Sequence, residues 1–327
     1  MIAGKRIASF FHPERFQGWG KQRNYFEGWY FKVLNKDKTK AFAFIPGIAF
    51  DPQGTGHSFV QVLDGKVLTA QYHRFDQKDF IPSANSFEVK VAASLFSAQG
   101  IQLDLDGIKG EMHFSGNVPW PSPFYSPGIM GPFSFVPFME CYHGIVSMDH
   151  GITGGLQING EHIDMDGGRG YIEKDWGRSF PSGYIWMQSN HFQEEGISLK
   201  SSIARIPWLG SSFTGFISGL WLQNELIRFT TYNGTRLRKC YADLQKVHVV
   251  MQNKRHRIEW KAKRDHATAL ASPIMGLMDG RIEESMSSIL EFQLTDTGSG
   301  KIIYEGISFV TALEVAGNIS SILVNRP

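Results

Sequence analysis

Hydrophobic and polar residues alternate with a period of two along most of this chain, and the longer period of a helix is rare. Residues 25–33 (YFEGWYFKV) are typical. Alternation predicts a strand with two distinct faces. One face carries Tyr25, Glu27, Trp29 and Phe31, and the other carries Phe26, Gly28, Tyr30 and Lys32. The segment therefore places one acid among aromatic rings, either enclosed with them or solvated at a sheet edge.

Many other segments have the alternation or the β-branched and aromatic composition of strands, and turn residues separate them. Asp64-Gly65 and Asn159-Gly160 are signals for tight hairpins. The further predicted strands cover residues 40–48, 57–63, 66–74, 87–93, 101–106, 109–116, 140–149, 154–158, 161–166, 184–192, 197–206, 213–222, 226–232, 236–241, 246–251, 257–263, 285–295 and 301–313.

Three segments depart from this pattern. Residues 1–23 mix polar and aromatic side chains and are expected to form an entry arm. Residues 117–138 are rich in proline and glycine, which predicts a long irregular loop, either a lid or an ordinary crossover. Residues 272–278 predict one short helical turn.

Many short strands with regular turns are typical of β-sandwiches and β-barrels. About twenty strands exceed what one small barrel needs. We therefore expect an all-β protein of two barrel-like antiparallel domains, residues 1–170 and 171–327, with the seam near residues 165–180.

The stretch from 170 to 192 (GYIEKDWGRSFPSGYIWMQSNHF) has the most unusual composition. Alternation sets Tyr171, Glu173 and Asp175 against Ile172, Lys174 and Trp176. Burial of an unpaired charge costs several kcal/mol, so these charges are expected to pair or to face a ligand. Two close carboxyl groups would keep one proton available as a general acid. The alternative is structural: an acid paired with Arg178 or Lys174 at the seam.

The segment that follows the Pro181-Ser182-Gly183 break mixes rings with carboxamides. Alternation gives one shared face to Tyr184, Trp186, Gln188, Asn190 and Phe192. Such a face suits a mostly apolar cavity that holds a ligand with a polar head. The alternative is an outward-facing strand with scattered aromatic residues.

Composition excludes several classes of function. The net charge of +2 and the lack of a recognition motif argue against nucleic acid. Two cysteines favour a reducing compartment, and no apolar stretch reaches the ~18 residues of a membrane span. With no signal-peptide pattern at the start, we expect a cytoplasmic protein. The basic residues between 236 and 264 indicate peripheral contact with anionic lipids or, alternatively, a solvated face of hairpins.

Metal, nucleophile and phosphate chemistry lack their motifs. No H-E-x-x-H or paired-cysteine spacing is present, so no metal is expected, and residues such as His143 and His150 are assigned to satisfied or exposed positions. There is no G-x-S-x-G elbow and no glycine-rich loop before a helix.

Two blocks, YFEGWYFKV at 25–33 and GYIEKDWGRSFPSGYIWMQSN at 170–190, resemble the tocopherol cyclase family. The resemblance implies a pair of lipocalin-like β-barrels related to carotenoid hydratases. It also implies a cofactor-independent isomerase that protonates an alkene of a prenylated hydroquinone or related isoprenoid, so that the phenol oxygen closes a ring. The alternatives are a lipocalin-like carrier of a hydrophobic small molecule and, third, an interaction scaffold.

On this resemblance, the residues divide by expected role. The acid is expected among Glu27, Glu173 and Asp175. A carbocation needs ring faces, and the substrate-binding set comprises Trp29, Tyr30, Lys174, Trp176, Tyr184, Trp186, Gln188 and Asn190, with the two carboxamides orienting the hydroxyl head group.

Overall fold

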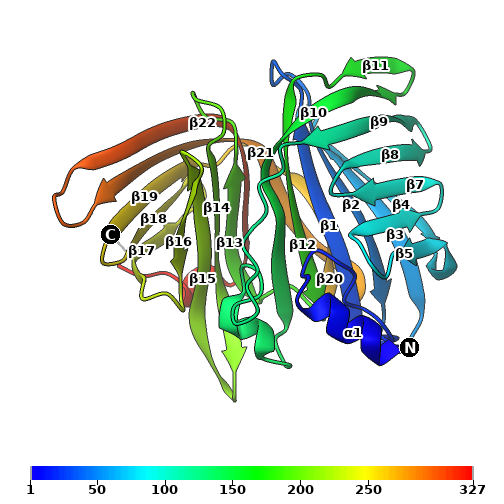
Figure 1. The fold of residues 1–327 in the computed structure, drawn as a ribbon, viewed down its shortest axis with the longest axis horizontal. Coiled ribbons are helices and arrows are strands. Elements are labelled where there is room, and N and C mark those ends of the chain that lie inside the picture. Colours follow the sequence, from blue (N-terminus) through cyan, green and yellow to red (C-terminus); the bar gives the residue numbers. More distant parts are fainter. Residues whose placement is uncertain (1, 326–327) are drawn as a thin grey trace. The chain divides into compact units, whose positions relative to one another are not determined.

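The computed structural model describes residues 2–325, so Met1, Arg326 and Pro327, the outermost residues of the two expected domains, lie outside the described residues. The described chain forms two antiparallel sheets and one short α-helix (Figure 1). The predicted all-β class is therefore confirmed.

The chain divides into two compact units. Unit 1 comprises Met1–Phe180 and Leu270–Arg281, and unit 2 comprises Pro181–Ala269 and Ile282–Pro327. The expected boundary at residue 170 lies within a strand, Gly168–Gly177. The lipocalin-like domains 1–170 and 171–327 stay a prediction.

Unit 1 is built on a sheet that runs through most of its residues. Its elements are α1 (Ile2–Phe10), β1 (Tyr25–Leu34), β2 (Ala41–Phe50), β3 (Gly56–Asp64), β4 (Thr69–Asp76), η1 (Gln77–Asp79), β5 (Phe80–Pro82), β6 (Glu88–Val91), β7 (Ser94–Ser97), β8 (Gly100–Leu105), β9 (Ile108–Ser115), η2 (Gly131–Phe135), β10 (Cys141–Ile158), β11 (Glu161–Asp164) and β12 (Gly168–Gly177). The strand order is β4-β3-β2-β1-β12-β10-β9-β8-β7-β6-β5, and β11 pairs with β10.

The second sheet has the order β16-β15-β14-β13-β22-β21-β19-β18-β17, and β20 pairs with β21. Its elements, with the last short helix, are β13 (Gly183–Ser189), β14 (Ser198–Trp208), β15 (Ser211–Leu222), β16 (Glu225–Thr230), β17 (Arg236–Ala242), β18 (Lys246–Gln252), β19 (His256–Lys263), β20 (Thr268–Ile274), β21 (Leu277–Asp296), β22 (Ile302–Gly317) and η3 (Ile319–Ser321).

Each sheet buries one apolar face, as the alternation predicts. In unit 1, Trp29, Phe31 and Val33 of β1 lie in a core of aromatic and branched side chains, where the Trp29 and Phe87 rings stack 5.5 Å apart. In unit 2 the core contains Ile185 and Met187 of β13. Among the described residues, no helix has the length and the hydropathy that crossing a bilayer requires.

The turn predictions can be checked directly. Asn159 (φ 50°) and Gly160 (φ 88°) join β10 to β11, the positive φ pair that a tight hairpin requires. The helical turn predicted at 272–278 is wrong: β20 and β21 occupy those residues and turn at Met275 (φ 51°) and Gly276 (φ 79°). Local composition did not reveal that these residues pair as strands.

Two other segments refine the prediction. Residues 140–149 and 154–158 form one long strand, β10, whose pairing with β12 shifts register between Ile145 and Ser147 and between Ser147 and His150. Such irregularities bend a strand without ending it. The loop that follows β9 is irregular, as predicted, apart from η2.

Candidate active site

Strand pairing at the centre of the first sheet determines which of the predicted site residues lie next to each other. β12 lies between β1 and β10, and residues paired across antiparallel strands share a face. The register pairs Trp29 with Lys174, whereas it pairs His143 with Asp175. Glu173 lies on the face of Asp175, and Lys174 lies on the opposite one, in agreement with the predicted alternation.

Glu27 faces Lys174 and not the other two acids. Both side chains are fully buried, and Glu27 Oε1 lies 2.6 Å from Lys174 Nζ. Three further donors reach the carboxylate: the backbone N–H of Gln17 at 2.8 Å, the backbone N–H of Gly18 at 2.9 Å and the hydroxyl of Tyr25 at 2.5 Å. These four donors occupy the carboxylate oxygens within the fold. The geometry thus favours a structural role for Glu27, on the face opposite to Glu173 and Asp175.

Lys174 is equally occupied. Its ammonium donates to the carbonyl of Pro13 at 3.0 Å and to the carbonyl of Arg15. It lies 4.8 Å from the centre of the Trp29 ring and 4.6 Å from that of Trp176. Burial lowers the pKa of Lys174, and neighbouring carboxylates oppose part of that shift. These two rings therefore already face a resident cation.

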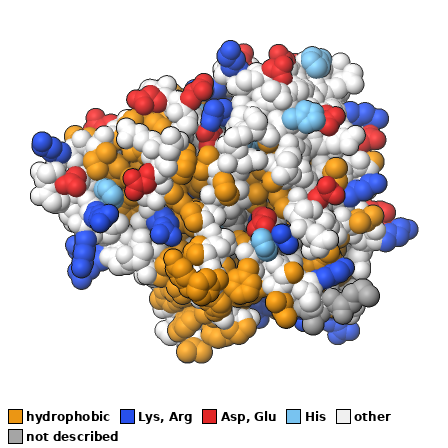
Figure 2. All heavy atoms as spheres, in the orientation of Figure 1, with side chains coloured by type: hydrophobic (Ala, Val, Ile, Leu, Met, Phe, Trp, Pro, Cys, Tyr) orange, Lys and Arg blue, Asp and Glu red, His pale blue; other side chains and the backbone are white. Residues whose placement is uncertain are grey.

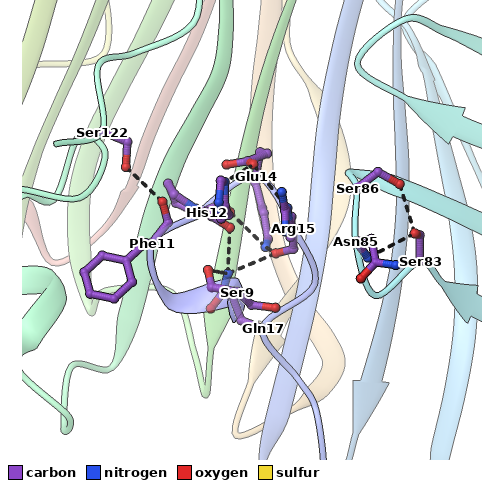
Figure 3. A network of polar contacts seen from close by, with 12 residues as sticks. Ser9, Phe11, His12, Glu14, Arg15, Gln17, Ser83, Asn85, Ser86 and Ser122 are labelled. Atoms are coloured by element: carbon purple, nitrogen blue, oxygen red, sulfur yellow. Dashed lines mark hydrogen bonds and ion pairs between the residues drawn. The ribbon is translucent and has the colours of Figure 1, made fainter. Parts of the chain in front are cut away.

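Gln17 holds the arm that carries these contacts. Its side-chain amide donates to the carbonyls of Ser9 at 2.8 Å, His12 at 3.0 Å and Arg15 at 3.1 Å (Figure 3). The amide closes residues 9–17 into a compact loop, so that the backbone N–H of Gln17 stays at the Glu27 carboxylate. The expected entry arm is thus a short helix followed by a loop that contacts the buried ion pair.

His143 stands between the two remaining acids. Its Nδ1 is 2.7 Å from Asp175 Oδ1, and its Nε2 is 3.5 Å from Glu173 Oε2. The hydroxyl of Tyr171 donates to Glu173 Oε2 at 2.5 Å, and Cys141 Sγ lies 3.7 Å from Asp175 Oδ1. His143, Glu173 and Tyr171 are buried, and 25% of the Asp175 side chain is exposed. We call His143, Glu173 and Asp175 the acid cluster.

Two hydrogen-bond donors beside the cluster keep their protons. Burial raises the pKa of Tyr171, and Glu173 raises it further; burial and then Asp175 do the same for the Cys141 thiol. Both groups therefore remain protonated donors. With Asp175 accepting from Nδ1–H, His143 Nε2 lies 3.5 Å from Glu173 Oε2 and makes no hydrogen bond within the described residues.

The same three side chains are a candidate metal-binding set among residues 2–325, because one ligand atom from each lies within 4.8 Å of the others. The hydrogen bond between Nδ1 and Asp175, however, fits an orienting carboxylate behind the histidine. With Asp175 so engaged, the set offers His143 Nε2 and a Glu173 oxygen as ligands, fewer than the three protein ligands of a typical catalytic zinc site. The donor set fits proton transfer better.

Tyr30 of β1 is paired with Glu173 across the strands and so lies on the face of the acid cluster. The other predicted residues belong to unit 2. Tyr184, Trp186 and Gln188 are buried on the face of β13 opposite to its core face. The hydroxyl of Tyr184 donates to Glu314 Oε2 at 2.7 Å, and Gln188 Nε2 lies 3.4 Å from Asn190 Oδ1.

β13 ends at Ser189, so Asn190 lies just beyond the strand. The prediction that Phe192 shares the face of Tyr184 is wrong, because Phe192 packs in the core against Phe292, with ring centres 5.0 Å apart. The alternation was carried past the end of the strand.

The structure thus sorts the predicted residues into three groups. One face of the first sheet carries Glu173, Asp175 and Tyr30. The other face of that sheet carries Glu27, Trp29, Lys174 and Trp176. Tyr184, Trp186, Gln188 and Asn190 lie in unit 2. The sequence analysis missed His143 as a site residue. A signal was present, since His143 lies in a predicted strand, but the partner strand and its register were unknown.

The fold defines a protein of two antiparallel β-sheets, the first of which carries the acid cluster. The sequence model of the Tocopherol cyclase-like family matches residues 108–317, most of the chain. The chain belongs to this family, and the resemblance seen in its motifs is confirmed.

Named relatives agree with this assignment. A probable tocopherol cyclase of Oryza sativa subsp. japonica is 26% identical over 363 residues, which cover 91% of this chain and 76% of the relative. A tocopherol cyclase of Zea mays is 28% identical over 202 residues, or 55% of this chain and 40% of the relative. Both are described as chloroplastic, so the cytoplasmic location expected here stays a prediction.

Among solved structures, CghA in complex with Sch210972 resembles this chain with a TM-score of 0.55 and 11% identity, over 90% of this chain and 88% of that one. CghA alone gives a TM-score of 0.54. At this identity the likeness establishes the fold.

Proposed function

We propose that the protein is a tocopherol cyclase-like isomerase that closes a ring in a prenylated hydroquinone or related isoprenoid. The His143–Glu173 pair donates a proton to a trisubstituted alkene, which becomes a tertiary cation. The phenol oxygen then bonds to the cationic carbon and releases its proton to the pair. Substrate and product have the same atoms, so the reaction requires no oxidant, reductant or nucleotide.

One observation carries the proposal: a buried imidazole lies between two carboxylates, 2.7 Å from one and 3.5 Å from the other. A general acid works best in a dry site where its proton is held by a positioned base. Asp175 orients the ring and Tyr171 fixes Glu173, which leaves the pair to exchange the proton. Family membership supports the reaction class.

The other predicted residues take supporting roles in this proposal. Tyr30, which is paired with Glu173 across the strands, offers a ring beside the acid cluster. Tyr184 and Trp186 of unit 2 stay predicted ring faces for a substrate, and Gln188 and Asn190 stay its predicted contacts to a hydroxyl head group. The proposal also retains lipocalin-like barrels, which the contacts of β6 with β2 and β3 support because they curl the first sheet toward closure.

The test is turnover of a panel of prenylated hydroquinones by matched variants. Glu173→Gln and His143→Gln keep the size of each side chain and remove the shared proton, so we expect each to lower kcat by a factor of about 10² to 10⁴. Glu161→Gln is the control, because 66% of that side chain is exposed and its carboxylate pairs with Lys40 at 3.0 Å. Thermal unfolding of each variant separates loss of chemistry from loss of fold.

Two outcomes count against the proposal. Full turnover by both Glu173→Gln and His143→Gln removes the assigned donor. No turnover of any substrate by the wild-type protein, together with an unmodified lipid retained in native mass spectrometry, favours the alternative function as a carrier of a hydrophobic molecule.

A further inference from the structure

Unit 1 has a group of exposed apolar side chains that includes no member of the acid cluster. The largest exposures belong to Phe124 (77%), Ile7 (68%) and Tyr125 (66%), and Phe11 and Phe135 are exposed as well. We call these five residues the aromatic surface. Large apolar side chains in such a group mark a site of interaction.

The five residues come from two segments that contact each other. The rings of Phe10 and Phe135 lie 5.3 Å apart, and the hydroxyl of Ser122 donates to the carbonyl of Phe11 at 3.3 Å. Figure 3 shows that contact, with the Phe11 ring turned away from the polar network. The N-terminal arm and the loop before β10 therefore lie against each other, and both carry exposed apolar side chains.

Charge is distributed unevenly over the two segments. Residues 115–139 contain no Asp, Glu, Lys or Arg, whereas residues 2–23 contain five basic residues and one acidic residue. Figure 2 shows hydrophobic side chains at the place on the viewed face where Figure 1 draws the loop with η2. The arm thus adds positive charge beside an uncharged loop with exposed rings.

We infer that the aromatic surface docks on a lipid bilayer that contains anionic lipid. Phe and Tyr suit the boundary between headgroups and acyl chains, and basic residues beside inserted apolar ones strengthen binding to anionic lipid. The six prolines at positions 119 to 137 give the loop no edge on which a partner strand could pair. This surface differs from the basic hairpins at 236–264, where Arg257 and Lys261 share Glu259 as a partner.

Co-sedimentation with vesicles tests the inference on the full chain. The vesicles contain phosphatidylcholine alone or phosphatidylcholine mixed with phosphatidylglycerol. We expect the wild-type protein to bind the mixed vesicles, and the Phe124→Ser/Tyr125→Ser variant to require about tenfold more lipid for half binding. The control is Leu244→Ser/Ile302→Ser, which removes two exposed apolar side chains of unit 2 and should shift binding by less than about twofold.

Three outcomes overturn the inference. In the first, the wild-type protein stays in the supernatant with both vesicle types. In the second, the control variant loses as much binding as the Phe124→Ser/Tyr125→Ser variant. In the third, the wild-type protein binds no vesicle but self-associates in sedimentation velocity, and the variant does not, which assigns the surface to a second copy of the chain. Unchanged unfolding midpoints for both variants show that the comparison concerns folded protein.

Discussion

The buried pair of Glu27 and Lys174 gives the sharpest prediction of stability. Lys174→Met removes the ammonium but keeps most of the volume, and it leaves a fully buried carboxylate without its cation. Loss of one partner of a buried pair costs about 3–5 kcal/mol. We therefore expect the free energy of unfolding to fall by about that amount, because the backbone N–H groups of the arm neutralise no charge.

A double-mutant cycle separates the pair from its surroundings. Glu27→Gln/Lys174→Met leaves no buried charge at the site, so its destabilisation should be smaller than the sum of the two single effects by about 2 kcal/mol or more. The assay is urea unfolding followed by tryptophan fluorescence, with the slopes compared between variants.

The matched control is Lys40→Met. Lys40 pairs with Glu161 at 3.0 Å, and 66% of the Glu161 side chain is exposed. Exposed pairs contribute about 0–1 kcal/mol. A loss for Lys174→Met no larger than that for Lys40→Met, or strict additivity in the cycle, would refute the reasoning.

Three further predictions concern buried groups of unit 1. Burial and then the charge of Arg169 lower the pKa of His150 from 6.5 to about 3. As pH falls, the unfolded chain protonates this imidazole before the folded chain does, so the free energy of unfolding, measured in urea, should fall between pH 6.5 and 3. His150→Leu should make that free energy less dependent on pH. A methyl group at Gly170 would lie 2.2 Å from His150 Nε2, whereas one at Gly4 would have no neighbour within 4 Å. In urea unfolding, Gly170→Ala should lower the free energy of unfolding by about 1–3 kcal/mol, and the control Gly4→Ala should not lower it. Tyr171→Phe removes the donor of Glu173 and should cost about 1.5–3 kcal/mol by the same assay.

Local pattern was sufficient for much of this structure. The alternation in residues 171–176 separated Glu173 and Asp175 from Lys174, and the register of β12 agrees with it. A period of two needs no knowledge of the neighbouring strand. For the same reason, the two-residue turn at Asn159-Gly160 was readable from sequence.

The rest depended on contacts between distant segments. His143 meets Asp175 only because β10 pairs with β12 in one register, and that register contains two shifts. Glu27 meets Lys174 on a face that residues 9–18 close, and no local pattern in those residues indicates an N–H directed at a carboxylate. Sequence therefore located the acids, while the partners that decide their roles came from the fold.

The most direct measurement is the isotope content of the product that the wild-type protein forms in deuterated water. If the acid cluster initiates cyclisation, the ring product carries one deuterium, on the former alkene carbon that bore hydrogen. The Glu173→Gln variant then forms the labelled ring about 10² to 10⁴ times more slowly. A ring product without deuterium at that carbon would contradict proton-initiated closure, and equal labelling by Glu173→Gln and His143→Gln would contradict the assignment of the donor.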